Sequence, residues 1–122
     1  MSYALVTGGS SGIGFAYAAA LAKRGYNIFI VSNRDDLNQE SQEKLQKQYP
    51  NIIVSTLMMD LAQEKSAQDL FDYCHEHNIL VDVLVNNAAI DLSNLSEGFF
   101  NLGFSLLKIH GSYLFSCFRF YL

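Results

Sequence analysis

The sequence predicts an α/β fold in which a parallel sheet lies between two layers of helices. Short apolar segments, typical of buried strands, alternate along the chain with longer segments of helical periodicity. A glycine-rich turn joins the first apolar segment directly to the first helical one, and a second apolar segment then completes a strand–helix–strand unit. This alternation predicts a doubly wound, three-layer fold, truncated after about four strands in the order three-two-one-four.

The first unit consists of an apolar strand at Tyr3–Thr7, the glycine-rich turn and an alanine-rich helix over about residues 13–24. Small residues in this helix allow close approach to the sheet, and Gly25 is placed to end it. The next strand is predicted at Asn27–Ser32, whose apolar run indicates burial on both faces. Residues 33–36 are the turn that follows.

The remaining elements continue the same alternation. A helix rich in Gln, Glu and Lys is predicted at about residues 37–48, largely exposed, and residues 49–51 with the single proline end it. Strands are predicted at Ile52–Met58 and Val81–Val85. Between them, apolar residues recur at the spacing of one helix face over about residues 62–77.

The turn after the first strand has the composition of an anion-binding site. Amides at a helix N-terminus have no partner within the helix and carry about half a positive charge, so they bind a phosphate without a cationic side chain. Gly8, Gly12 and Gly14 let the backbone turn tightly, approach phosphates and pack the helix on the strand. The alternative is a plain surface loop, which the flanking strand and helix disfavour. The expected donors to a pyrophosphate are two hydroxyls and one amide, those of Ser10, Ser11 and Ile13.

These residues resemble the short-chain dehydrogenase/reductase family, whose first turn reads Thr-Gly-x-x-x-Gly-Ile-Gly, as residues 7–14 do. Two further family marks follow in order, Asp60-Leu61 after the third strand and Asn-Asn-Ala-Ala at residues 86–89 after the fourth. The resemblance covers residues 2 to about 91. It implies a Rossmann-type fold, a nicotinamide dinucleotide as cofactor and hydride-transfer oxidoreductase chemistry.

The end of the second strand distinguishes between the two nicotinamide cofactors. An acidic residue there accepts hydrogen bonds from the ribose 2′-hydroxyl, whereas a neutral residue followed by arginine accommodates a 2′-phosphate. The chain reads Ser32-Asn33-Arg34, so Asn33 and Arg34 are expected to bind NADP in preference to NAD. The alternative is that Arg34 is a solvated turn residue paired with Asp35 or Asp36.

The resemblance also implies the contacts of the later motifs. The Asp60 side chain is expected to contact the adenine with help from the Leu61 amide, and Asp60 is also placed to cap the following helix. Asn86, Asn87 and Ala88 are expected to line the ribose side of the cofactor and to tie the fourth strand to its neighbours through buried amide bonds. The family usually has Gly where Ala89 stands, and the added methyl either crowds the nicotinamide or excludes a positive φ.

No catalytic residue is expected in this chain. The family uses a Tyr whose pKa is lowered by a Lys four residues later, with a Ser upstream and an Asn in a preceding helix. None of the seven tyrosines is followed by a Lys at that spacing. Residues 107–115 resemble the segment around the family's Asn, with Lys108 or His110 in its place. The alternative is that the sequence after Ala89 is unrelated to the family. We therefore expect an NADP-binding protein that is catalytically incomplete as this chain; the alternative is a non-enzymatic interaction or oligomerisation module.

Composition disfavours several other classes of protein. The net charge is −4 at pH 7 and the pI is about 5.1, so the basic face of a nucleic-acid-binding protein is not expected. The N-terminus shows no basic segment followed by an apolar one, so no secretory signal is expected. Residues 99–122 contain Lys108 and Arg119, and each such cation costs at least about 2.5 kcal/mol at the centre of a bilayer, so no membrane span is expected.

The two cysteines, Cys74 and Cys117, have no paired spacing and indicate reduced thiols in a cytoplasmic protein. Cys74 opens the short run Cys-His-Glu-His at residues 74–77. Consecutive side chains on a helix point about 100° apart and do not converge on one ion, so no metal site is expected.

The composition changes near residue 91. We divide the chain into an NAD(P)-binding half at residues 1–91 and an aromatic-rich segment at 92–122 that is expected to be helical. Residues 98–122 hold eight of the sixteen aromatic residues and only two fixed charges, which is too apolar for a free tail. A fourth strand left at the sheet edge also favours pairing with another chain, so a homo-oligomer is expected through this segment.

Overall fold

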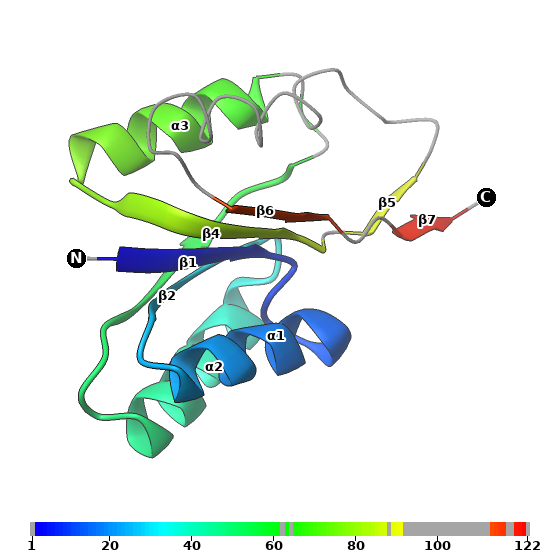
Figure 1. The fold of residues 1–122 in the computed structure, drawn as a ribbon. Helices are drawn as coiled ribbons and strands as arrows, with labels where there is room; N and C mark the ends of the chain where they lie inside the picture. Colours follow the sequence, from blue (N-terminus) through cyan, green and yellow to red (C-terminus); the bar gives the residue numbers. More distant parts are fainter. Residues whose placement is uncertain are drawn as a thin grey trace.

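The computed structural model describes residues 2–61, 63, 65–87, 89–91, 113–116 and 119–121. Its centre is a parallel sheet with the strand order β3-β2-β1-β4-β6. Helices α1 and α2 cover one face of this sheet and α3 covers the other (Figure 1). The predicted three layers, the parallel directions and the order three-two-one-four are therefore confirmed.

Four strands and three helices correspond to the elements that the sequence predicts. In chain order they are β1 (Ser2–Thr7), α1 (Gly12–Lys23), β2 (Asn27–Ser32), α2 (Asp35–Gln48), β3 (Val54–Met58), α3 (Ser66–Glu76) and β4 (Leu80–Asn86). The strand β2 has the predicted bounds, and the others differ from the prediction only at their ends.

The ends of α1 and β3 have local causes. Gly25 has a φ of +91° and its amide donates to the carbonyl of Ala22 at 2.9 Å, so it ends α1 as predicted. The strand β3 begins at Val54 rather than Ile52. The amide of Ile52 is used instead in a turn, where it donates to the Tyr49 carbonyl at 3.3 Å.

The segment before α3 differs most from the prediction. The helix begins at Ser66, four residues later than expected, with Lys65 as its N-cap. A turn precedes it, in which the amide of Gln63 donates to the Asp60 carbonyl at 3.3 Å. The Ser66 hydroxyl then donates to the carbonyl of Leu61 at 3.0 Å. The prediction that Asp60 caps this helix is therefore wrong.

Apolar side chains pack in two clusters, one on each face of the sheet. Alternate residues of β1 and β2 enter opposite clusters because successive side chains of a strand point to opposite faces. On the α3 face, Leu5 and Phe29 pack with Leu70 and Cys74. Complete burial of one such large side chain stabilises the fold by roughly 1.5–3 kcal/mol. The cluster on the α1 and α2 face includes Ala4, Val6, Ala18, Ala22, Ile28, Ile30 and Leu45.

The C-terminal segment contains strands where a helix was expected. β6 (Tyr113–Ser116) pairs in parallel with β4, and β7 (Arg119–Tyr121) pairs with β5 (Ala89–Asp91) in a separate two-stranded sheet. The expectation of helix is thus wrong at these positions, and β4 is not a sheet edge. Pairing satisfies the backbone groups that β4 would otherwise expose. The rest of the segment 92–122, with Lys108 and His110, lies outside the described residues, and the division of the chain at residue 91 stays a prediction.

Candidate nucleotide site

The predicted site residues lie after the carboxyl ends of four parallel strands. The glycine-rich turn follows β1, the Asn33-Arg34 pair follows β2, Asp60-Leu61 follows β3, and Asn87 follows β4. Strand order reverses between β1 and β4, since the chain leaves β1 toward β2 and β3 and then returns to the other side. In open parallel sheets the crevice at such a reversal is the usual ligand site.

The glycines of the turn have the geometry that the sequence predicts. Gly8 and Gly12 have φ values of +64° and +57°, a region that side chains rarely adopt. Gly14 is buried where α1 crosses the end of β1. A Cβ there would overlap the Gly8 carbonyl oxygen and lie 2.5 Å from Asn87 Nδ2. Gly14 therefore permits the close contact of helix, turn and β4.

The N-terminus of α1 is electrostatically open. No side chain of the described residues caps the first turn of α1, and the hydroxyl of the N-cap residue Ser11 makes no capping hydrogen bond. The first turn also contains no acidic residue, whereas α2 begins with Asp35 and Asp36. Ile13 and Ser11 are exposed, so the positive end of the α1 dipole meets no compensating charge from its own first turn.

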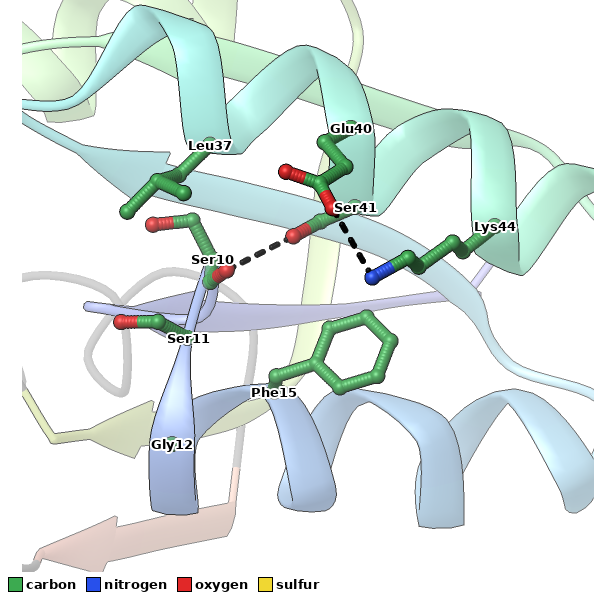
Figure 2. A pocket seen from close by; sticks show the side chains of 8 residues that line it. All are labelled: Ser10, Ser11, Gly12, Phe15, Leu37, Glu40, Ser41 and Lys44. Atoms are coloured by element: carbon green, nitrogen blue, oxygen red, sulfur yellow. Dashed lines mark hydrogen bonds and ion pairs between the residues drawn. The ribbon is translucent and has the colours of Figure 1, made fainter.

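A pocket of about 240 Å³ lies between this N-terminus and α2 (Figure 2). The hydroxyl of Ser41 bridges its two sides by donating to the Ser10 carbonyl at 2.8 Å. Lys44 contributes a cation to the wall, but its Nζ pairs with Glu40 Oε1 at 3.0 Å, so the wall has no net charge. The remaining lining residues are Ser11, Gly12, Phe15 and Leu37.

A second group of hydrogen bonds ties β4 to the turn. The amide of Asn87 donates to Thr7 Oγ1 at 2.9 Å, and Thr7 Oγ1 donates to the Val85 carbonyl at 3.3 Å. Asn87 Nδ2 donates to the Gly8 carbonyl at 3.4 Å. These bonds tie the fourth strand to β1, as expected for Asn87. Within the described part of the chain, the buried Oδ1 atoms of Asn86 and Asn87 have no donor.

A third group, which the sequence analysis missed, lies between the turn and α2. Asn38 and Ser41 are buried on α2 at 0% and 3% exposure, and they share one helix face with Leu45. Asn38 bonds to Ser32 at the end of β2, and Ser32 bonds to Ser10 in the turn. A signal was present, because residues 38, 41 and 45 are spaced as one face of a helix. Only Leu45 was apolar, so the buried side of this helix was not recognised.

Arg34 forms an ion pair with Asp36. Its Nε and Nη2 lie 3.4 and 3.2 Å from the two carboxylate oxygens, and this contact lowers the pKa of Asp36. The alternative of a paired turn residue is thus seen in this structure, with Asp36 rather than Asp35. Both side chains are more than half exposed, so the pair is weak and screened, and Arg34 is able to exchange it for another anion.

The residues expected at the adenine, Asp60 and Leu61, follow shortly after β3 and differ in exposure. Asp60 is exposed, and its Oδ2 accepts a hydrogen bond from Gln63 Nε2 at 3.1 Å. Leu61 is buried in the α3-side cluster. Ala88 lies outside the described residues.

Residues 74–77 separate rather than converge. Cys74 is buried in the core, and burial raises the pKa of its thiol to about 12. The exposed His77 ring stacks on Tyr73 with centroids 3.9 Å apart, and its Nδ1 lies 2.9 Å from the Tyr73 carbonyl. Across the described ranges, no group of three or more potential metal ligands is found. The helices described here are also too short or too polar to cross a membrane.

Comparison with known proteins identifies the family. The model of the short chain dehydrogenase family matches residues 2–102. The chain is 45% identical over 87 residues to the uncharacterized oxidoreductase YgcW of Escherichia coli, an alignment that covers 71% of this chain and 32% of that protein. It is 37% identical over 91 residues to a very-long-chain 3-oxoacyl-CoA reductase of Caenorhabditis briggsae, with coverage of 73% and 28%. These alignments thus span about a third of the curated relatives.

Solved structures agree with this relationship. An alcohol dehydrogenase from the archaeon Thermococcus sibiricus, complexed with 5-hydroxy-NADP, superposes with a TM-score of 0.73 at 27% identity, over 95% of this chain and 57% of that one. A menthone neomenthol reductase from Mentha piperita gives a TM-score of 0.65 at 32% identity, over 73% and 32% of the two chains. With the glycine-rich turn and sheet order described above, these matches show that the chain belongs to the short-chain dehydrogenase family.

Proposed function

We propose that this chain binds NADP as the cofactor-binding part of a short-chain oxidoreductase, and that it is catalytically incomplete as it stands. One observation carries the proposal. The amides at the start of α1 lie beside a glycine turn that a side chain at Gly14 would disrupt. Within the described chain, their partial positive charge is balanced neither by a side-chain cap nor by an acidic residue in the first turn. Such a helix end favours an anion such as a pyrophosphate.

The residues present fit a dinucleotide. Asn86 and Asn87 each leave a buried carbonyl oxygen without a donor among the described residues, at the strand end next to the turn. A buried acceptor without a partner is costly, and the hydroxyl groups of a ribose are donors of the required kind. A bound nicotinamide would supply the hydride acceptor or donor. The groups proposed to hold the cofactor are Gly8, Ser10, Ser11, Gly12, Ile13, Gly14, Asn33, Arg34, Asp60, Leu61, Asn87 and Ala88.

The choice of NADP over NAD rests on the end of β2. Asn33 and Arg34 provide no carboxylate for a ribose 2′-hydroxyl, and the exposed Arg34 guanidinium is held only by Asp36 among the described residues. A dianionic 2′-phosphate competes well for such a guanidinium because charge-assisted bonds to phosphate are strong. The complex of the Thermococcus sibiricus relative with an NADP derivative supports the same choice.

Fluorescence titration of the chain with NADPH and NADH tests this proposal. We expect saturable binding with NADPH tighter than NADH, and an Arg34→Ala variant should weaken NADPH binding about tenfold while leaving NADH nearly unchanged. Arg24→Ala is the matched control, since it removes an exposed arginine at the other end of α1. Absence of binding by a folded chain at about 1 mM of either cofactor would overturn the proposal, because cofactor sites saturate at roughly micromolar to millimolar levels.

Catalytic incompleteness rests on the absence of a Tyr-x-x-x-Lys pair from the printed sequence. We expect a chain that binds cofactor but does not oxidise NADPH in the presence of simple aldehydes and ketones. Turnover of any of these carbonyl compounds by the purified chain would contradict this part of the proposal.

A second candidate function is assembly without catalysis. It is supported by the aromatic composition of residues 98–122 and by the exposed Ile13 and Tyr17 on one face of α1, at 42% and 41% exposure. On this basis we propose a homo-oligomer. Sedimentation velocity at tens of micromolar would contradict it by showing only monomer.

We also propose a cytoplasmic location, supported by the free, buried thiol of Cys74.

A further inference from the structure

The strand β3 lies at one end of the five-stranded sheet, so one of its two sides has no neighbouring strand. On its inner side, the carbonyl of Ile53 accepts from β2 at 2.9 Å and the amide of Met59 donates to β2 at 3.0 Å. Backbone groups of successive residues point to opposite sides of a strand. The amides and carbonyls of Val54, Thr56 and Met58 therefore point away from β2, along the outer edge of the sheet.

Glutamine side chains of α2 close the first part of this edge. Gln46 Nε2 donates to the Ile52 carbonyl at 2.7 Å, and Gln46 Oε1 accepts from the Val54 amide at 3.3 Å. Gln42 Nε2 donates to the Val54 carbonyl at 2.7 Å. A residue of a further parallel strand would bond to the same carbonyl and the same amide as Gln46 does. The side-chain amide of Gln46 thus takes the place of one residue of such a strand.

The closure ends at Val54. Across the described part of the chain, no group bonds to the outward amides and carbonyls of Thr56 and Met58, and Met58 is 61% exposed. The open part of the edge is short, because strands in proteins are mostly about five to six residues long. Without the glutamines, the outward groups from Ile52 to Met58 would all be available, which is enough for an ordinary strand pair.

Residues 52–59 lack the usual sequence protection against pairing. The segment reads Ile-Ile-Val-Ser-Thr-Leu-Met-Met and contains neither a charged residue nor a proline. Edge strands in natural proteins are commonly guarded by charges, prolines or bulges. Uncharged apolar and β-branched segments pair readily with copies of themselves, since identical strands then bring no like charges together. The glutamines of α2 supply the protection that the strand's own sequence does not.

We propose that Gln42 and Gln46 form an autoinhibitory contact on β3, and that the edge beneath them is an interface for a second copy of this chain. When both side chains leave the edge, β3 pairs with β3 of the second copy about a two-fold axis, which makes the two strands antiparallel. The glutamines are four residues apart on one face of α2, and both are half-buried. This surface is separate from the aromatic segment 92–122 and involves no cofactor.

The test replaces both glutamines with methionine, which has a similar length and helix propensity but lacks the amide. Sedimentation velocity at tens of micromolar should show larger assemblies for Gln42→Met/Gln46→Met than for the unmodified chain at the same concentration. Gln39→Met is the matched control, since Gln39 is exposed on the same helix and its side chain bonds to Asp35. The control should sediment as the unmodified chain does. A folded double variant that also does so overturns the proposal.

A proline distinguishes pairing at β3 from association through another surface. Thr56→Pro removes an outward amide, and edge strands tolerate proline where the amide faces solvent. Added to the double variant, Thr56→Pro should return sedimentation to that of the unmodified chain, because the edge no longer pairs across this position. Persistence of the larger assemblies would refute the interface at β3.

Amide hydrogen exchange tests the contact even if the double variant does not fold. In the unmodified chain, the Val54 amide should exchange at least about threefold more slowly than the Thr56 amide, since only Val54 has a hydrogen-bond partner on the outer edge. Gln46→Met should speed exchange at Val54 about three- to tenfold and leave the inward Ser55 amide unchanged. Equal exchange of Val54 and Thr56 in the unmodified chain would show that the edge is not closed.

Discussion

Glycines at three positions of the first turn are required for two separate physical reasons. Gly8 and Gly12 have positive φ, while Gly14 has ordinary helical neighbours but no room for a Cβ. Nothing lies within 4 Å of a Cβ built on Gly12, so its requirement is conformational, whereas that of Gly14 is steric. Both requirements concern the backbone that positions the amides at the start of α1.

These two glycines therefore predict a graded substitution series. Gly12→Ala should lower the free energy of unfolding by about 1–2 kcal/mol, the cost of placing a side chain in the left-handed region. Gly14→Ala should lower it by about 3 kcal/mol or more, since the backbone of Gly8 in the turn and that of α1 must move apart. Urea denaturation followed by circular dichroism measures both values. Equal costs at the two positions would contradict the steric role of Gly14.

At the scale of elements, α2 and α3 pack against opposite faces of the sheet by different means. The buried face of α3 is mainly apolar, with Ala67, Leu70 and Cys74 in one cluster. The buried face of α2 has only Leu45 as an apolar residue, and hydrogen bonds of Asn38 and Ser41 supply the rest. The polar face lies beside the proposed nucleotide site, so α2 both packs on the sheet and bonds to Ser32 and Ser10 there.

The burial of Cys74 in α3 predicts a pH dependence of stability. The thiol has a pKa near 12 in the folded protein against an ordinary value of 9.0, so the unfolded chain loses this proton first as the pH rises. The contribution is therefore fully present below about pH 9 and is lost progressively between pH 9 and 12. The free energy of unfolding should fall by up to about 1.4 kcal/mol per pH unit above pH 9.

A Cys74→Ala variant separates this effect from other titrations. It should be less stable at pH 7 because the core loses a buried sulfur, but its stability should fall less steeply from pH 9 to 10.5. Urea unfolding at several pH values gives the two slopes. Parallel slopes for the two proteins would show that the thiol is not the group responsible.

At the scale of the whole molecule, pairing with β6 makes β4 an internal strand of the sheet. The sequence predicted a sheet that ends at β4, whereas β6 continues it in parallel register from Val83 to Asn86. Since β4 ends at Asn86 and Asn87 follows it directly, its outer edge is part of what holds these two asparagines of the proposed site in place. The short sheet of β5 and β7 lies directly after these residues.

Removal of residues 113–122 should expose the edge of β4. We expect lower thermal stability and concentration-dependent association, because an unpaired edge strand pairs readily with other chains. Thermal unfolding and sedimentation velocity over a range of concentrations measure the two effects. Phe118→Ser in the chain of 122 residues is a control for lost aromatic content, since it leaves both strand segments in the sequence. A truncated chain that is as stable as the chain of 122 residues and associates no more strongly would contradict the role of β6.

Much of the fold was predictable because its signals are local. The glycine turn, the two-sided apolar strands and the strand–helix alternation each depend on residues close in sequence, and together they predicted the order β3-β2-β1-β4. The start of α3 was mispredicted because Ser66 satisfies the Leu61 carbonyl in a turn that helical periodicity does not report. The strands β6 and β7 were missed because their pairing partners lie far away in the chain.

The same distinction applies to the site. Local sequence was sufficient to propose a phosphate-binding turn, a preference for NADP at Arg34 and ribose contacts of the asparagines at the end of β4, since each lies at a strand end in a recognisable pattern. The hydrogen-bond chain through Asn38, Ser32 and Ser10 joins three segments whose proximity depends on how α2 packs on β2. The glutamine contacts at the outer edge of β3 likewise depend on where α2 lies against that strand. A residue type is thus enough to name a candidate ligand group, but which partner a hydroxyl or an amide bonds to depends on every group that folding brings to it.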